Sequence, residues 1–285
     1  DVAIGALPPA PTISGITPDT GVSAVDGVTN LSSFAVLGTA QAGALVTIFD
    51  NGIVAGQATV ANNGTFSVSV TSTTGSHRLT ASVQDLATGH ASGVSAALTV
   101  VVDQNAPVAP TIAGFTVATD SGAASNDGVT NAVTPVLTGS AEAGSTVTVL
   151  VNGTLLGSTV AGTNGIWSLS AGSPAEGTYT LAAFATDVAG NVGTTASGPS
   201  VVVDRTGPSV TVTSDVDAVK AGQTAVLTFA FSEVVTGFTL SDVTVANGTL
   251  SNFAAGAGRR RRGSRCGRGR AGRERRRLGH RGWLR

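Results

Sequence analysis

The chain has 285 residues, of which 38 are Gly and 41% are hydrophobic, whereas only 4% are aromatic. This composition is typical of many short strands that are joined by tight turns and that pack small β-branched side chains. Cys266 is the only cysteine, which excludes an internal disulfide framework and a cysteine-based metal site. No apolar run approaches the roughly 20 residues of a membrane-spanning helix, so we expect no membrane span.

The formal net charge of −1 hides two segments of opposite charge. Before residue 259 the chain has three basic and 16 acidic side chains, whereas residues 259–285 hold 13 Arg and a single acid. The two segments therefore have different compositions and, by expectation, different structures. Because the sequence has no Met and no basic, apolar leader before Asp1, we interpret it as an internal piece of a longer protein.

An internal repeat with an offset of 101 residues organises the chain. Residues 19–30 read DTGVSAVDGVTN and residues 120–131 read DSGAASNDGVTN. The same offset relates Gly38 to Gly139 and Phe66 to Trp167, so one unit is about 100 residues long. We expect a linker at 1–10, repeat 1 at 11–106, repeat 2 at 107–207, a truncated third repeat at 208–255 and an Arg/Gly-rich tail at 256–285.

Seven strands are predicted in repeat 2. Val147, Val149 and Val151 alternate with polar residues, as do Trp167 and Leu169, so these side chains are expected to point inward. Asn-Gly at 152–153 predicts a tight hairpin turn, and 51–52 repeats it. Seven short strands per repeat favour an immunoglobulin-like β-sandwich, with a barrel as the minority alternative. The predicted strands are 111–115, 135–140, 146–151, 154–160, 166–170, 178–186 and 196–203.

Several motifs together resemble those of a known family. GTAQAG begins at Gly38 and GSAEAG at Gly139, each before a Val-Thr strand, and TDVAGN ends at Asn191. NGIW ends at Trp167, and both repeats close on Val-Val-Asp. These residues resemble the bacterial immunoglobulin-like (Big) domains strung along large repetitive adhesins and other exported proteins. The resemblance implies an all-β fold of tandem seven-stranded immunoglobulin-like sandwiches. It also implies an extracellular or cell-surface location on a bacterium.

The last part of the chain has its own pattern. After Pro208, the segments VTVT, LTFAFSE and FTLSDVTV look like a second variety of the same broad family. A half-sandwich buries too little apolar surface to offset chain entropy, so we expect 208–255 to be poorly ordered or prone to aggregate. For the tail, two interpretations stay open. It is either a frameshifted, disordered end of a GC-rich gene or a genuine segment that binds nucleic acid or a membrane surface. We favour the first and expect no nucleic-acid partner.

Carboxylates are predicted to meet where two repeats join. In a seven-strand sandwich the first loop and the end of the last strand share one pole, so Asp19, Asp26 and Asp103 should face Asp187 and Asn191 of the next repeat. Few cationic side chains are present to neutralise them, whereas calcium accepts six to eight oxygen ligands. The resemblance points the same way, because related adhesin repeats are stiffened by junction calcium. The matching positions in repeat 2 are Asp120, Asp127 and Asp204.

A simpler interpretation of the same acids stays open. Asp19, Asp26, Asp120 and Asp127 lie near Gly in loops, and Asp is a common turn former because its side chain binds nearby backbone N–H groups. In that case the acids stabilise their own loops and bind no ion.

Catalysis finds little support in the sequence. The three histidines, His77, His90 and His280, are not repeated, and no nucleophile elbow, zinc-protease motif or phosphate loop occurs. We expect His77 and His90 to be surface residues, and Trp167 and Phe66 to be core residues and not a sugar-stacking platform. The chain is therefore predicted not to be an enzyme.

The sequence favours a structural role. We expect spacer or stalk repeats of an adhesin, whose partners are the neighbouring repeats and, through domains not present, a host or cell-surface glycan or protein. The alternative is an accessory or ligand-binding module, for glycan or protein, of a secreted enzyme.

Overall fold

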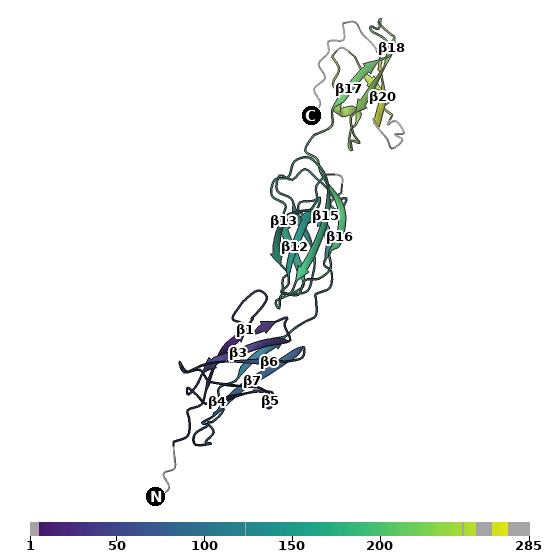
Figure 1. Ribbon diagram of the computed structural model, residues 1–285. Helices are drawn as coiled ribbons and strands as arrows, with labels where there is room; N and C mark the ends of the chain where they lie inside the picture. The colour runs from purple at the N-terminus through teal and green to yellow at the C-terminus, as the bar shows by residue number, and fades with distance from the viewer. Residues whose placement is uncertain (1–5, 123, 247, 255–263, 273–285) are drawn as a thin grey trace. The chain divides into compact units, whose positions relative to one another are not determined.

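The structure is a computed structural model that describes residues 6–122, 124–246 and 248–254 and the backbone of 264–272 (Figure 1). In these residues the regular structure is β-strand, apart from the 3₁₀ turn η1 (Leu240–Asp242). The predicted all-β class is confirmed. The chain divides between Asp204 and Arg205 into two compact units, and the first unit contains both repeats.

Repeat 1 is a sandwich of two sheets. One sheet has the order β1-β3-β6 and the other β2-β8-β7-β4-β5. All neighbouring strands are antiparallel except β2 and β8, which pair in parallel. The strands are β1 (Thr12–Thr17), β2 (Val28–Thr29), β3 (Ser33–Thr39), β4 (Leu45–Asp50), β5 (Ile53–Thr59), β6 (Thr65–Thr71), β7 (Gly75–Gln84) and β8 (Leu98–Val102).

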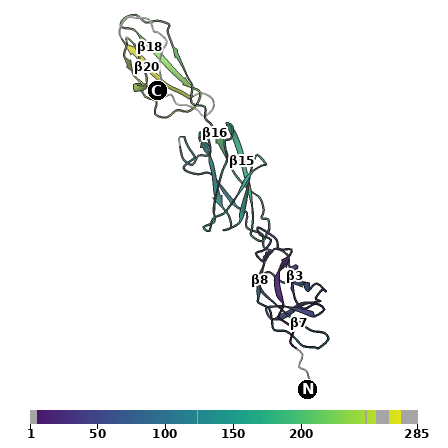
Figure 2. The same cartoon turned by 90° about the vertical axis from the view of Figure 1, so that its left-hand side faces the viewer.

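Repeat 2 has the same topology, with sheets β14-β11-β9 and β10-β16-β15-β12-β13. Figure 2 shows the long strands β15 and β16 side by side, as their antiparallel register requires. The predicted bounds are confirmed for β9, β12, β13, β14 and β16, and those of β11 and β15 differ by one residue at the start. The strands are β9 (Thr111–Phe115), β10 (Val129–Thr130), β11 (Val136–Ser140), β12 (Thr146–Val151), β13 (Thr154–Val160), β14 (Ile166–Ser170), β15 (Gly177–Thr186) and β16 (Ala196–Val203).

An additional short strand in each repeat was not predicted. The Asp-Gly-Val-Thr motif supplies β2 and β10, in which Val28 pairs with Val101 and Val129 with Val202. The motif therefore attaches the long loop after the first strand to the edge of the larger sheet. This attachment fixes the position of loop 19–30 in repeat 1 and of loop 120–131 in repeat 2.

Alternating side chains build the core of each repeat. Val147 and Val149 on β12 are fully buried between the sheets, whereas Thr148 between them is half-buried. Trp167 is 1% exposed and Phe66 is 5% exposed, which confirms that both are core residues. Because burying an aromatic ring removes a large apolar area from water, these two side chains are major contributors to the two cores.

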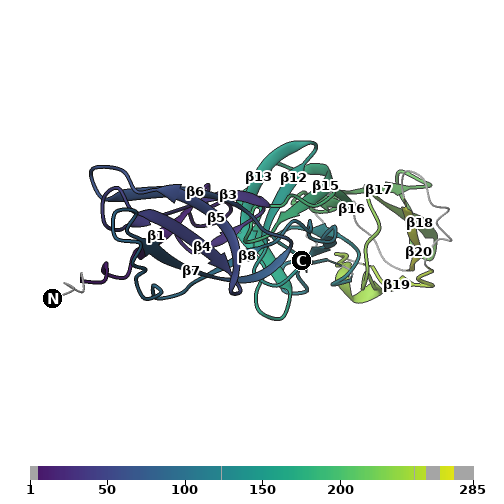
Figure 3. The same ribbon diagram turned by 60° about the horizontal axis from the view of Figure 1, so that its bottom comes forward.

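The unit after Asp204 has one sheet, with the order β17-β18-β20-β19 (Figure 3). Its small core holds Leu227, Phe229 and Phe231, and the ring of Phe238 lies 4.9 Å from that of Phe231. Residues 255–263 and 273–285 lie outside the described residues, so the predicted disorder of the tail stays a prediction there. The strands are β17 (Val210–Ser214), β18 (Thr224–Phe231), β19 (Leu250–Ser251) and β20 (Ser264–Gly272).

Candidate functional site

The end of repeat 1 at which β8 ends is formed by loop 19–30 and Asp103, and we call it the exit pole of repeat 1. Asp19 organises the loop, because its Oδ2 accepts the N–H of Gly27 at 2.9 Å. The N–H of Asn30 donates to the hydroxyl oxygen of Thr20 at 2.8 Å. Asp103 follows β8, and its N–H donates to the carbonyl of Thr29 at 2.9 Å. Hydrogen bonds within repeat 1 therefore define the surface of this pole.

Loop 120–131 gives repeat 2 an exit pole built in the same way. Asp120 Oδ2 accepts the N–H of Gly128 at 3.1 Å, and Asn131 N–H donates to the hydroxyl oxygen of Ser121 at 2.9 Å. Asp204 N–H donates to the carbonyl of Thr130 at 2.8 Å. The hydrogen bonds of the exit pole thus recur with the same 101-residue offset as the sequence.

Loop 187–191 follows β15 in repeat 2 and is closed by its own hydrogen bonds. Asp187 is 3% exposed. Its Oδ1 accepts the backbone N–H of Asn191 at 2.9 Å, and its Oδ2 accepts the Asn191 side-chain amide at 2.8 Å. The loop is a compact Asp-x-Ala-Gly-Asn turn whose two polar side chains hold each other in place.

This loop contacts the exit pole of repeat 1 through three hydrogen bonds. Asn191 Nδ2 donates to the main-chain carbonyl of Asp103 at 2.7 Å. The Thr20 hydroxyl donates to the carbonyl of Ala189 at 2.9 Å. Val22 N–H donates to the carbonyl of Val188 at 3.1 Å. Because two of the donors belong to repeat 1 and one to repeat 2, each repeat satisfies backbone groups of the other.

Two glycines allow the backbone of loop 19–30 to approach the backbone of loop 187–191. Gly21 has φ +93°, and a Cβ built there would lie 2.0 Å from the carbonyl oxygen of Val188. Gly190 has φ +94°, and its Cβ would lie 3.1 Å from the Cα of Gly21. Any other residue at position 21 would have to displace the loop. At these two glycines the main chains of the two repeats therefore lie directly against each other.

The structure brings together some of the predicted metal ligands and separates others. Asp19, Asp103, Asp187 and Asn191 belong to the two surfaces that meet between the repeats. Asp26 lies on loop 19–30, where its Oδ1 accepts the N–H of Val28 at 3.0 Å. The other three, Asp120, Asp127 and Asp204, lie in the exit pole of repeat 2.

The fit of these residues to calcium is partial. In the part of the chain that the structure describes, no three His, Cys, Asp or Glu side chains are grouped as metal ligands. The Asp187 carboxylate is occupied by Asn191, and Asn191 presents amide protons to the Asp103 carbonyl. Asp19 Oδ1 and Asp120 Oδ1, however, are buried acceptors without a hydrogen-bond donor, and such oxygens are the ones a cation could use.

His77 lies elsewhere in repeat 1, and the expectation that it is a surface residue is wrong. It is 7% exposed on β7. Its Nδ1 lies 2.7 Å from Asp50 Oδ2, and its Nε2 lies 2.7 Å from the carbonyl of Thr73. The Ser72 hydroxyl donates to the same Asp50 oxygen at 2.9 Å. The serine therefore bonds to the acid and not to the histidine, so this cluster lacks the nucleophile–base bond of a hydrolytic triad.

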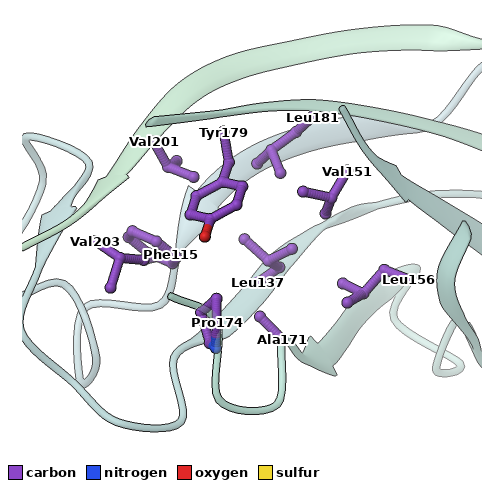
Figure 4. A pocket seen from close by; sticks show the side chains of 10 residues that line it. All are labelled: Phe115, Leu137, Val151, Leu156, Ala171, Pro174, Tyr179, Leu181, Val201 and Val203. Carbon is purple, nitrogen blue, oxygen red and sulfur yellow. The ribbon is translucent and has the colours of Figure 1, made fainter. Parts of the chain in front are cut away.

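Repeat 2 has an apolar cavity of about 50 Å³ near the start of β15 (Figure 4). The Tyr179 ring lines it, and the Tyr179 hydroxyl donates to the carbonyl of Ala175 at 2.7 Å. Ligand pockets usually measure 300–1,000 Å³, so this cavity is too small to hold a typical substrate. The lining residues are Phe115, Leu137, Val151, Leu156, Ala171, Pro174, Tyr179, Leu181, Val201 and Val203.

Models of a known protein family match most of the chain. A family model described as a bacterial Ig-like domain matches residues 8–104 and 106–205, and a second model of the same description matches 204–261. No curated protein matches the chain. Among the described residues, no helix has the length and apolar character needed to cross a membrane.

Solved structures resemble the chain at low identity. The fibronectin(III)-like modules of CbhA from Clostridium thermocellum are 20% identical over 65% of this chain and 93% of theirs, with a TM-score of 0.37. A BSP domain of a biofilm associated protein is 22% identical over 69% of this chain and 29% of its own, with a TM-score of 0.25. A putative membrane anchored protein from Corynebacterium diphtheriae is 13% identical over 87% and 77%, with a TM-score of 0.25. The chain thus spans less than a third of the biofilm protein's chain, and these similarities carry no argument about function.

Proposed function

The chain belongs to the bacterial Ig-like domain family, and from this premise we propose that its repeats are a structural spacer in a protein secreted from, or exposed on, a bacterial cell. The observation that carries the proposal is the contact between the repeats. Three hydrogen bonds join loop 187–191 to the exit pole of repeat 1. A spacer needs joints that hold its modules in a fixed mutual orientation, and a contact of this kind opposes free rotation.

We also propose that the chain is not an enzyme. Supporting this, the Ser72 hydroxyl bonds to Asp50 and not to His77, so the serine–histidine bond of a hydrolytic triad is missing. The apolar cavity of repeat 2 is too small for a typical substrate. Its lining also lacks the titratable pairs that acid–base catalysis requires.

Calcium at the repeat junction is a second proposal. It is supported by Asp19 Oδ1, a buried acceptor without a donor, and by the excess of acids over bases before residue 259. Asp19 and carbonyl oxygens of its loop would hold the ion, which would neutralise the acidic pole. Calorimetric melting with calcium and with chelator tests it, because an ion that binds only the folded state must raise the melting temperature. An unchanged melting temperature would contradict the calcium proposal, and Asp19→Asn should abolish any shift in the melting of repeat 1.

Stretching single molecules of the full chain tests the spacer. A load-bearing module unfolds at a distinct force peak and then releases its hidden length. Each repeat of roughly 95 residues should release about 30 nm, at 3.3–3.6 Å per extended residue. Two peaks of equal spacing are expected, and extension without peaks would contradict a mechanical role. Binding of the chain to a glycan array would instead favour the accessory-module alternative.

A further inference from the structure

The two repeats present different loops at the end opposite the exit pole. Repeat 2 has the five-residue loop 187–191, whereas repeat 1 has the six-residue loop 85–90, with the sequence DLATGH. The Ala of the first loop, Ala189, is fully buried, whereas Ala87, Thr88 and Gly89 of the second are exposed. The differences between the two loops therefore indicate which features a loop needs in order to fit an exit pole.

The side chain of Asn191 contributes a specific pattern of donors. Its amide has two protons, of which one goes to Asp187 Oδ2 and the other to the carbonyl of Asp103. Both partners are acceptors only, so the amide nitrogen must face them. An Asp at this position has the same shape but would place a carboxylate against two acceptors.

The corresponding loop in repeat 1 uses its acid differently. Asp85 Oδ1 accepts the backbone N–H of Ala87 at 2.8 Å, within its own turn. His90 occupies the position that matches Asn191, and its Nδ1 is buried without a hydrogen-bond partner. The 85–90 loop therefore lacks an amide that bridges its own acid to a neighbouring carbonyl. It also has an extra residue, Thr88.

We propose that loop 187–191 is a selective docking element. The exit pole of repeat 1 accepts an Asp-x-Ala-Gly-Asn loop through Thr20, Gly21 and the Asp103 carbonyl, and it rejects a loop of the 85–90 form. The proposal deepens the spacer role and rests on it, because it names which kind of repeat can follow another at a fixed joint. It requires no bound cation, since the donors and acceptors of the two repeats satisfy each other directly.

The experiment measures hydrogen exchange of the Val22 amide by NMR in the full chain, because this N–H in repeat 1 donates to a carbonyl of repeat 2. Asn191→Asp should raise its exchange rate about tenfold or more, the effect of losing a net hydrogen-bond energy of this kind. Replacing 187–191 with DLATGH should do the same. The amides of Val149 and Ala183 in the core of repeat 2 should stay protected, which shows that the repeat still folds.

A matched pair of glycine variants provides the control. Gly21→Ala and Gly122→Ala introduce the same side chain at equivalent loop positions, both with positive φ. A Cβ at Gly21 collides with Val188, whereas one at Gly122 meets no described atom within 4 Å. Only Gly21→Ala should expose the Val22 amide.

Two results would overturn the proposal. One is unchanged Val22 exchange in the folded Asn191→Asp chain. The other is unchanged Val22 exchange when DLATGH replaces residues 187–191 in a folded repeat 2, because the exit pole would then accept both forms of the loop. The force peaks of the separate repeats should persist in Asn191→Asp. Failure of the selective joint is therefore distinguishable from failure of the spacer role.

Discussion

His77 and Asp50 form a buried hydrogen-bonded pair in repeat 1, with 2.7 Å between Nδ1 and Oδ2. The second ring nitrogen, Nε2, lies 2.7 Å from the carbonyl oxygen of Thr73, so both ring nitrogens face oxygen atoms. The matching positions of repeat 2, the third residue of β15 and the last residue of β12, hold Tyr179 and Val151. One fold thus fills the same place with a hydrogen-bonded histidine and aspartate in one copy and with a tyrosine and a valine in the other.

Replacing this pair piece by piece should show strong coupling. Asp50→Val leaves His77 buried with an unpaired donor, and we expect it to destabilise repeat 1 by about 2–3 kcal/mol. Adding His77→Tyr, which recreates the repeat 2 combination, should recover part of that loss. Urea unfolding of both single variants and the double variant measures the coupling as a double-mutant cycle. Additive effects would show that the two side chains do not act as a pair.

Gly38 should tolerate no side chain. A Cβ there would lie 2.1 Å from the carbonyl of Thr12 and 2.3 Å from the Phe66 ring. Gly38→Ala should therefore destabilise repeat 1 by about 3 kcal/mol, the cost of overpacking a core. Gly93→Ala is the control in the same repeat, because nothing lies within 4 Å of its Cβ position. Equal melting temperatures for the two variants would disprove the close packing of strand against ring.

Trp167 should be replaceable by the residue of repeat 1. Its indole N–H is buried without a hydrogen-bond partner, which costs about 1–3 kcal/mol relative to a solvated group. Trp167→Phe loses apolar contact but removes that penalty, so we expect a change in unfolding free energy within about 1 kcal/mol. Trp167→Ala should cost about 3–5 kcal/mol. Circular dichroism during denaturation compares the two, and a loss for Phe as large as that for Ala would contradict the argument.

Asp85 should titrate below its ordinary range. The N–H of Ala87 donates to its carboxylate, and this bond lowers the pKa of Asp85. Because the folded-state pKa is the lower one, the stabilisation is present above the unfolded pKa and is lost as the pH falls through the folded pKa. A carbon-13 NMR titration of the carboxyl, compared with a peptide of residues 83–92, measures this. A value in the chain equal to that in the peptide would contradict the turn.

The sequence predicted most strands because alternation and Asn-Gly turns are local signals. It did not predict β2 and β10, since a two-residue strand has no alternation to detect. The buried position of His77 had a usable signal, because His77, Leu79, Ala81 and Val83 share one face of β7 and all are buried. The expectation of a surface position does not use this periodicity, which places the histidine inside.

The contact between the repeats was only partly predictable. Strand order indicated which pole meets which loop. The approach of Gly21 to Gly190 joins residues 169 positions apart, and neither glycine has a local pattern that marks it as a contact. The Asn191 amide was interpreted as a source of ligand oxygen, whereas its protons are the atoms that bridge to Asp103 and Asp187. Which end of an amide faces its neighbours depends on those neighbours and not on the sequence of the loop.

The fixed mutual orientation of repeats 1 and 2 is tested most directly by a spin-label distance. Labels at Gln57→Cys and Ser158→Cys, both exposed on β5 and β13, are attached in a full chain that also has Cys266→Ser. Double electron–electron resonance should then give a single narrow distance distribution that broadens in Asn191→Asp. A broad distribution in the chain with an unaltered junction would contradict the account.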